Sequence, residues 1–171
     1  MLTREEIQTY LAALNDEMAS QDAVGELCLF GGTVMCLVYQ ARPSTKDVDA
    51  IFVPTQTIRE AAQKVAATYH LPEDWLNDAV KGFVVPHPQR IFLDFPHLKV
   101  YIPEPDYLLA MKAMAARFDT QDADDVRFLI RYLSIQSAEA VFQIIENYYP
   151  RQQVRPATRY FVEEIFDENS G

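Results

Sequence analysis

The sequence is poor in cysteine, in glycine and in positive charge. Its two cysteines, Cys28 and Cys36, lie eight residues apart in apolar surroundings, a spacing that fits neither a CxxC redox pair nor a zinc-binding hairpin. With five glycines and ten prolines among 171 residues, the composition is that of an ordinary globular protein and excludes a fibrous or disordered chain. We therefore expect both cysteines to be buried free thiols in a reducing cytoplasm.

Positive charge is scarce: 15 Lys and Arg stand against 25 Asp and Glu, which gives a net charge of -10 and a pI near 4.7. Nonspecific binding to nucleic acid or to an anionic membrane depends on a surplus of Lys and Arg. No DNA partner is therefore expected, and an RNA partner would need a local basic patch. The local basic cluster in the sequence is Arg151, Arg155 and Arg159.

Long apolar runs are also missing. The run VMCLVY is far too short to cross a bilayer, and the start MLTREEIQTYL lacks the apolar core of a signal peptide. We expect a cytoplasmic protein without membrane contact. With 49% hydrophobic residues, the chain has enough apolar side chains for one domain, or for a core with an added helical part.

The first part of the chain reads as alternating helices and strands. Thr3 and Glu6 have the spacing of a capping box at the start of a helix over 3–20. Further helices are expected in TVMCLVYQ, over 57–69, and after Pro72 in a short helix that carries Trp75. About four strands are expected, at ELCLF (26–30), DVDAIFV (47–53), RIFLDF (90–95) and LKVYI (98–102).

The second part of the chain reads as helical throughout. Helices are expected over 106–117, 120–133, 137–148 and about 156–167, with Thr120 and Ser137 as caps. The expected fold is therefore α/β of the α+β kind, with a small mixed sheet of about four strands and flanking helices in residues 1–104. An all-helical C-terminal region follows in residues 105–171.

The segment LFGGTVMCLVYQARPSTKDVDAIFV carries the chemistry that we consider most informative. Gly31 and Gly32 follow a strand, and a backbone without Cβ atoms can approach phosphate oxygens, while a following helix offers unpaired N–H groups. Asp47 and Asp49 alternate along the next strand, so both carboxylates would face one side. Mg²⁺ prefers oxygen ligands and is commonly bound by one or two carboxylates together with substrate phosphates. The pattern therefore predicts a nucleoside triphosphate held with Mg²⁺ or Mn²⁺.

Polar residues near these two motifs extend the expected nucleotide site. Thr33 would add a hydroxyl, and Arg42, Thr45 and Lys46 would place donors and positive charge near the phosphates. Each motif alone has a plainer explanation, since a Gly-Gly pair is usually a turn and an isolated Asp-x-Asp is usually a solvated strand edge. Their conjunction in one strand, turn, helix and strand unit favours a functional site.

The same segment resembles the signature of the nucleotidyltransferase fold, the superfamily of DNA polymerase beta and the aminoglycoside nucleotidyltransferases. A second region, LLAMKAMAARFDTQDADDVRFLIRYL, resembles the lysine-bearing and aspartate-bearing helices of its AbiEii-like branch, small bacterial members included. The resemblance implies that Asp47 and Asp49 bind the metal and that Gly31 and Gly32 hold the triphosphate. Active members usually have a third carboxylate on a neighbouring strand, and the candidate here is Asp94, as a metal ligand and proton acceptor.

The resemblance also implies that Lys112, with Asp122 or Asp125, completes the site. It further implies an activity, the transfer of a nucleotide from a triphosphate to an acceptor such as a tRNA end or a protein hydroxyl. Members of this branch are similar to the toxin halves of toxin–antitoxin pairs, so a cognate antitoxin is an expected partner.

Several alternatives stay open from the residues themselves. Lys112 on a helix rich in Leu, Met and Ala is typical of a snorkelling side chain at the edge of a core. Asp122 and Asp125 also suit the first turn of a helix, with Arg117 or Arg131 in reach as ion partners.

The function has alternatives too. One is a catalytically silent fold member that acts as a nucleotide-binding or protein-interaction module, and another is a plain α/β domain with solvated aspartates. A position of Asp94 close to Asp47 and Asp49 would favour the enzyme.

Overall fold

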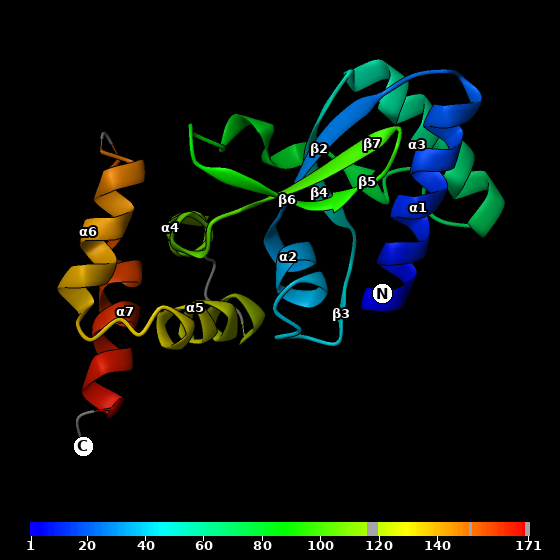
Figure 1. Ribbon diagram of the computed structural model, residues 1–171. Coiled ribbons are helices and arrows are strands. Elements are labelled where there is room, and N and C mark those ends of the chain that lie inside the picture. Colours follow the sequence, from blue (N-terminus) through cyan, green and yellow to red (C-terminus); the bar gives the residue numbers. More distant parts are fainter. Residues whose placement is uncertain (116–119, 151, 170–171) are drawn as a thin grey trace. The chain divides into compact units, whose positions relative to one another are not determined.

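The protein is described by a computed structural model over residues 1–115, 120–150 and 152–169, and these residues form a mixed α/β fold (Figure 1). The chain divides into two units, one of Met1–Val84 with Gln89–Pro103 and the other of Val85–Pro88 with Glu104–Gly171. The main boundary thus falls between Pro103 and Glu104, one residue before the expected boundary after residue 104. Nothing in the sequence pattern indicates that Val85–Pro88 belongs with the second unit.

The first unit is built on a five-stranded mixed sheet with the order β5-β4-β2-β7-β6. Its strands are β2 (Gly25–Phe30), β4 (Val48–Val53), β5 (Leu76–Asn77), β6 (Gln89–Asp94) and β7 (Leu98–Pro103). The central strand β2 runs antiparallel to β4 and parallel to β7, while β6 is antiparallel to β7 and β5 is parallel to β4. The four longer strands correspond to the four expected ones, and β5 adds a short edge.

Two helices, α1 (Arg4–Ser20) and α3 (Thr55–Tyr69), pack side by side on one face of this sheet (Figure 1). Gly25 of β2 shows the contact, because a Cβ there would lie 2.8 Å from Cδ1 of Ile58 and 3.0 Å from Cε of Met18. Leu27 and Leu29 follow at alternate positions on the same face and are buried. The two helices therefore cover this apolar face of the sheet.

Two sets of hydrogen bonds hold the start of the chain, a capping box at Thr3 and a short strand pairing. The capping box is confirmed, since the Glu6 amide donates to Oγ1 of Thr3 and the Thr3 amide donates to the Glu6 carboxylate. Just before the helix, β1 (Leu2–Thr3) pairs antiparallel with β3 (Ser44–Thr45). This pairing anchors the segment that leads into the two aspartates.

The short helix expected around Trp75 does not form. The segment instead contains a turn, the strand β5 and the 3₁₀ helix η1 (Ala79–Gly82). The Trp75 side chain is buried, its Nε1 donates to the carbonyl of Ala62 at 2.9 Å, and its own carbonyl accepts from the Val48 amide. These long-range hydrogen bonds satisfy the indole N–H of Trp75 and the backbone N–H of Val48 at the start of β4. Tertiary contacts therefore override the local preference for a helix.

The second unit is helical, as expected. Its helices are α4 (Pro105–Ala115), α5 (Thr120–Tyr132), α6 (Ala138–Tyr148) and α7 (Pro156–Asn169), and Ser137 caps α6 through the Ala140 amide. Tyr107 connects α4 to the segment Val85–Pro88, because its hydroxyl accepts from the Val85 amide and its ring stacks on His87 at 4.2 Å. That contact explains why the segment belongs to this unit.

Two further expectations concern burial and membranes. Cys28 and Cys36 are buried free thiols, as expected, and burial raises the pKa of Cys28 to about 12. No described helix combines the length and the apolar character that spanning a bilayer requires.

The capping box gives a first prediction about stability. Replacing Thr3 with Ala removes the side chain that satisfies an otherwise unpaired amide, so the free energy of unfolding should fall by about 1 kcal/mol in urea denaturation of the full chain. Thr9→Ala is the matched control, because Thr9 is exposed inside the same helix and Ala is the better helix former. Equal losses in both variants would contradict the role of the cap.

Candidate functional site

The first glycine of the pair lies against one of the aspartates. Gly31 has φ +61, a left-handed conformation that favours glycine, and it begins the seven-residue helix α2 (Gly31–Leu37). A Cβ at this position would lie 2.9 Å from Oδ2 of Asp49. The register explains the approach, since Asp49 of β4 pairs with Phe30, the residue that precedes the turn. The absence of a side chain therefore lets a carboxylate lie directly on the backbone of the turn.

The second glycine lies against a positive charge and a hydroxyl. A Cβ at Gly32 would lie 2.7 Å from Nη1 of Arg42 and 2.8 Å from Oγ1 of Thr45. Arg42 is half-buried. Thr45 is buried and belongs to β3, the strand that pairs with β1. The structure thus brings a guanidinium, a hydroxyl and a carboxylate around one glycine turn.

Thr33 holds the aspartate segment through backbone bonds. Its side chain is fully buried, its Oγ1 donates to the carbonyl of Asp47 at 3.1 Å, and the amide of Asp49 donates to it at 3.3 Å. One hydroxyl therefore bridges the backbone on both sides of Val48 and fixes the segment against α2. In this structure the Thr33 hydroxyl holds the backbone of the two aspartates, whereas the motif predicts a hydroxyl that binds phosphate.

The two aspartates offer oxygen donors of the kind that a hard cation takes. Asp47 directly precedes β4, Asp49 is the second residue of that strand, both are half-exposed, and the exposed Lys46 precedes them. Two carboxylates suit Mg²⁺, which keeps several waters and takes its remaining ligands from phosphates. Within residues 1–115, 120–150 and 152–169, no group of three or more His, Cys, Asp or Glu side chains is arranged to hold a metal.

Asp94, expected as a third metal ligand, lies at the other end of the sheet. It pairs with Lys99 of β7, which pairs with Glu26 of β2, whereas Asp49 pairs with Phe30 at the end of that same strand. Glu26 and Phe30 are roughly 13 Å apart along β2, and three strand spacings, roughly 14 Å, separate β6 from β4. Because ligands lie ~2.1 Å from a Mg²⁺ ion, Asp94 and Asp49 cannot share one. The expected third ligand is wrong.

Lys112, Asp122 and Asp125 come together in the second unit. The Lys112 ammonium lies 2.7 Å from Oδ2 of Asp125 and 3.6 Å from Oδ1 of Asp122, and Lys112 and Asp125 are both nearly buried. Lys112 is therefore an ion-paired residue inside the helical unit, and the alternative of a snorkelling side chain is wrong. The part of these three residues in a nucleotide site stays a prediction.

The structure describes only some of the arginines that were expected to pair with Asp122 and Asp125 or to form the basic cluster. Arg117, an expected ion partner of Asp122 and Asp125, and Arg151 of the basic cluster lie outside the described residues. Arg155 and Arg159 of that cluster are exposed, and the Arg159 guanidinium lies over the Phe142 ring at 4.7 Å.

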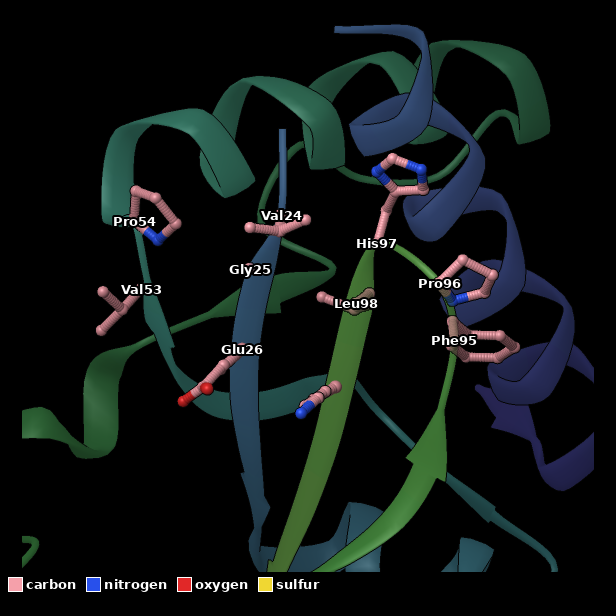
Figure 2. Close-up of a pocket in the computed structure, with 10 residues that line it drawn as sticks. Val24, Gly25, Glu26, Val53, Pro54, Phe95, Pro96, His97 and Leu98 are labelled. Carbon is pink, nitrogen blue, oxygen red and sulfur yellow. The ribbon is translucent and has the colours of Figure 1, made fainter. Parts of the chain in front are cut away.

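A cavity of about 440 Å³ opens at the end of the sheet opposite to Asp49 (Figure 2). Figure 2 shows that its lining comes from the start of β2, the end of β4 and the turn between β6 and β7, with mostly apolar side chains such as Val53, Pro54 and Leu98. Sequence reasoning missed this cavity because its walls come from three segments that are far apart in the chain. It is separate from the two aspartates.

A second cavity, of about 400 Å³, is connected with the glycine turn through Arg42. Its lining residues are Arg4, Glu5, Cys36, Gln40, Ala41, Arg42 and Pro43. Burial raises the pKa of the Cys36 thiol, and the nearby charges of Arg42, Glu5 and Arg4 act on that pKa in opposing directions. Sequence reasoning missed Arg4 because only the folded chain brings the start of α1 next to α2.

Comparison with known proteins adds no relative to this picture. No family model, curated protein or solved structure matches the chain. The resemblance to the nucleotidyltransferase fold therefore depends on the motifs in the sequence alone, and it stays a prediction.

The conformation of Gly31 predicts a specific loss of stability. Gly31→Ala should lower the free energy of unfolding by about 1–2 kcal/mol, because Ala is strained at positive φ and its Cβ would press on Asp49. The matched control is Gly82→Ala, where a Cβ meets nothing within 4 Å and φ lies outside the left-handed region. Urea denaturation that shows the same effect for both variants would contradict this account.

The buried pair in the second unit predicts non-additive effects. Lys112→Met leaves the buried Asp125 without the ammonium that lies 2.7 Å from its carboxylate and should cost about 3–5 kcal/mol of unfolding free energy. Lys112→Met combined with Asp125→Leu should recover most of this loss. Arg59→Met removes a partly exposed partner of Asp78 and should cost less than ~1 kcal/mol. A double variant that is less stable than Lys112→Met would refute the pairing argument.

Proposed function

We propose that the chain is a metal-dependent nucleotidyltransferase that binds a nucleoside triphosphate with Mg²⁺ at the glycine turn, transfers the nucleoside monophosphate to an acceptor and releases pyrophosphate. The single observation that carries the proposal is the contact of the Asp49 carboxylate with the backbone of Gly31. The Asp49 carboxylate lies against Gly31, and the Arg42 guanidinium lies against Gly32, the next residue of the turn. A carboxylate and a guanidinium beside a turn without side chains suit a cation and a polyphosphate together.

The residues of the site have distinct parts in this proposal. Asp47 and Asp49 would hold the cation, which when bound would neutralise charge on the reacting phosphates. The bare backbone of Gly31 and Gly32 admits phosphate oxygens, and Arg42 adds fixed positive charge there. In-line transfer requires orientation of the triphosphate more than a protein nucleophile, and these groups are held by the fold before a ligand arrives.

The acceptor and the biological setting follow the resemblance to the AbiEii-like branch. An RNA end such as that of a tRNA, or a protein hydroxyl, is the proposed acceptor, and the proposed setting is the toxin half of a toxin–antitoxin pair. An RNA acceptor would bind at the basic cluster, of which the structure describes Arg155 and Arg159, both exposed.

A second candidate is a fold member that binds the nucleotide without transferring it. The position of Asp94 favours this candidate, because active relatives of the fold usually have a third carboxylate at the metal and Asp94 lies at the far end of the sheet. Both candidates predict nucleotide binding, and only the first predicts transfer.

Calorimetry with ATP, CTP, GTP and UTP in Mg²⁺ tests the shared part of the proposal. At least one nucleotide should bind, and Asp47→Asn and Asp49→Asn should weaken that binding on the order of tenfold or more, which is about 1.4 kcal/mol. Asp94→Asn is the matched control and should bind like the wild type, because Asp94 is remote from the turn. Equal binding by wild type and all three variants would remove the two aspartates from the site.

Transfer is tested separately, by incubating the protein with α-labelled nucleotides and cell extract. Label on RNA or protein that depends on Asp49 supports the enzyme. Binding without any label transfer would instead support the silent module.

A further inference from the structure

We infer that the cavity between the start of α1 and the loop after α2, lined by Arg4 and Arg42, is a binding site for a phosphate group. This inference names a residue, Arg4, that lies outside the proposed metal site. The phosphate site itself does not require the proposed function, because a phosphate ion is by itself a sufficient ligand for the test, whereas the two sources of phosphate named below rest on that function.

Both guanidinium groups are positioned by the protein before any ligand binds. Nε of Arg4 donates to the carbonyl of Leu37 at 3.1 Å, which fixes this half-buried side chain at the C-terminal end of α2. Arginine carries five N–H donors, so this bond uses only one of them. Arg42 is likewise half-buried, with its Nη1 against Gly32. Donors whose orientation is already set lose little entropy on binding.

The local charge runs against that of the whole chain. Arg4 and Arg42 outnumber Glu5 in the lining, whereas the chain as a whole has a net charge of -10. Arginine forks bind phosphate with short charge-assisted hydrogen bonds, and two guanidiniums from separate segments match an anion that offers several oxygens. A phosphate group fits this chemistry better than a carboxylate, which one fork can satisfy.

The size of the cavity indicates that the phosphate is part of a larger molecule. About 400 Å³ is in the range of sites that take a small organic ligand, so a sugar or chain attached to the phosphate has room. Arg42 lines this cavity, and its Nη1 would lie 2.7 Å from a Cβ at Gly32. The phosphate therefore comes either from the nucleotide at the glycine turn or from a phosphorylated acceptor beside it.

The test uses inorganic phosphate, titrated into the ¹⁵N-labelled full chain at low salt and followed by amide shifts in NMR spectra. The wild type should show saturable shifts around Gln40, Ala41 and Arg42. Arg4→Gln should weaken the affinity about tenfold, equivalent to about 1.4 kcal/mol. Glu5→Gln should strengthen it, because one negative charge leaves the lining. Arg59→Gln, which changes an arginine paired with Asp78, is the control and should leave the affinity unchanged.

A structural role of Arg4 alone gives a different result. If Arg4 only caps α2, Glu5→Gln leaves phosphate affinity unchanged, and this result overturns the site even where Arg4→Gln unfolds the protein. Absence of saturable shifts in the wild type, or equal losses in Arg4→Gln and Arg59→Gln, overturns it as well.

Two further arms identify the source of the phosphate and separate the site from the proposed function. Asp47→Asn and Asp49→Asn should not weaken phosphate binding, because each removes a negative charge near Arg42, so a failure of the metal site leaves this inference standing. ATP that displaces phosphate identifies the nucleotide as the source, and a 5′-phosphorylated oligoribonucleotide that outcompetes its 5′-hydroxyl form identifies the acceptor. Failure of both to displace phosphate would overturn the claim that a phosphorylated ligand uses the cavity.

Discussion

The contact between Asp49 and the backbone of Gly31 is the constraint on which the rest of the site depends. A carboxylate that is partly withdrawn from water costs free energy unless positive charge or hydrogen-bond donors meet it. Here the fold meets that requirement locally, with Arg42 at the next glycine and with Thr33 fixing the backbone on either side of Val48. A side chain at either glycine would displace one of these groups, so the two glycines and Asp49, seventeen residues after the second glycine, form one physical unit.

Much of the fold was predictable because its signals are local. Apolar periodicity and caps are properties of short segments, and they gave α1, α3 and the four helices of the second unit, together with the four longer strands. The strands β1, β3 and β5 have two residues each, too few for any alternation to appear, and they exist only through long-range pairing. Trp75 was misassigned to a helix for the same reason.

The candidate site was predictable only where its residues are close in sequence. Gly31, Gly32 and the two aspartates belong to one strand, turn and strand unit, so their proximity follows from local connectivity. The prediction of Asp94 as a metal ligand was wrong because alternation along a strand does not reveal strand order or register. Both place Asp94 at the far end of the sheet. Arg4 was missed because its neighbour Leu37 is brought to it by tertiary packing.

The central claim is that a divalent cation and its nucleotide bind at the glycine turn. Mn²⁺ added with a nucleoside triphosphate to the ¹⁵N-labelled chain tests this claim directly, because a paramagnetic ion broadens the signals of nearby amides. The account predicts the strongest broadening at residues 31–33 and 47–49, and its loss in Asp49→Asn. Broadening centred instead on Glu26 and Asp94, or unchanged broadening in Asp49→Asn, would contradict it.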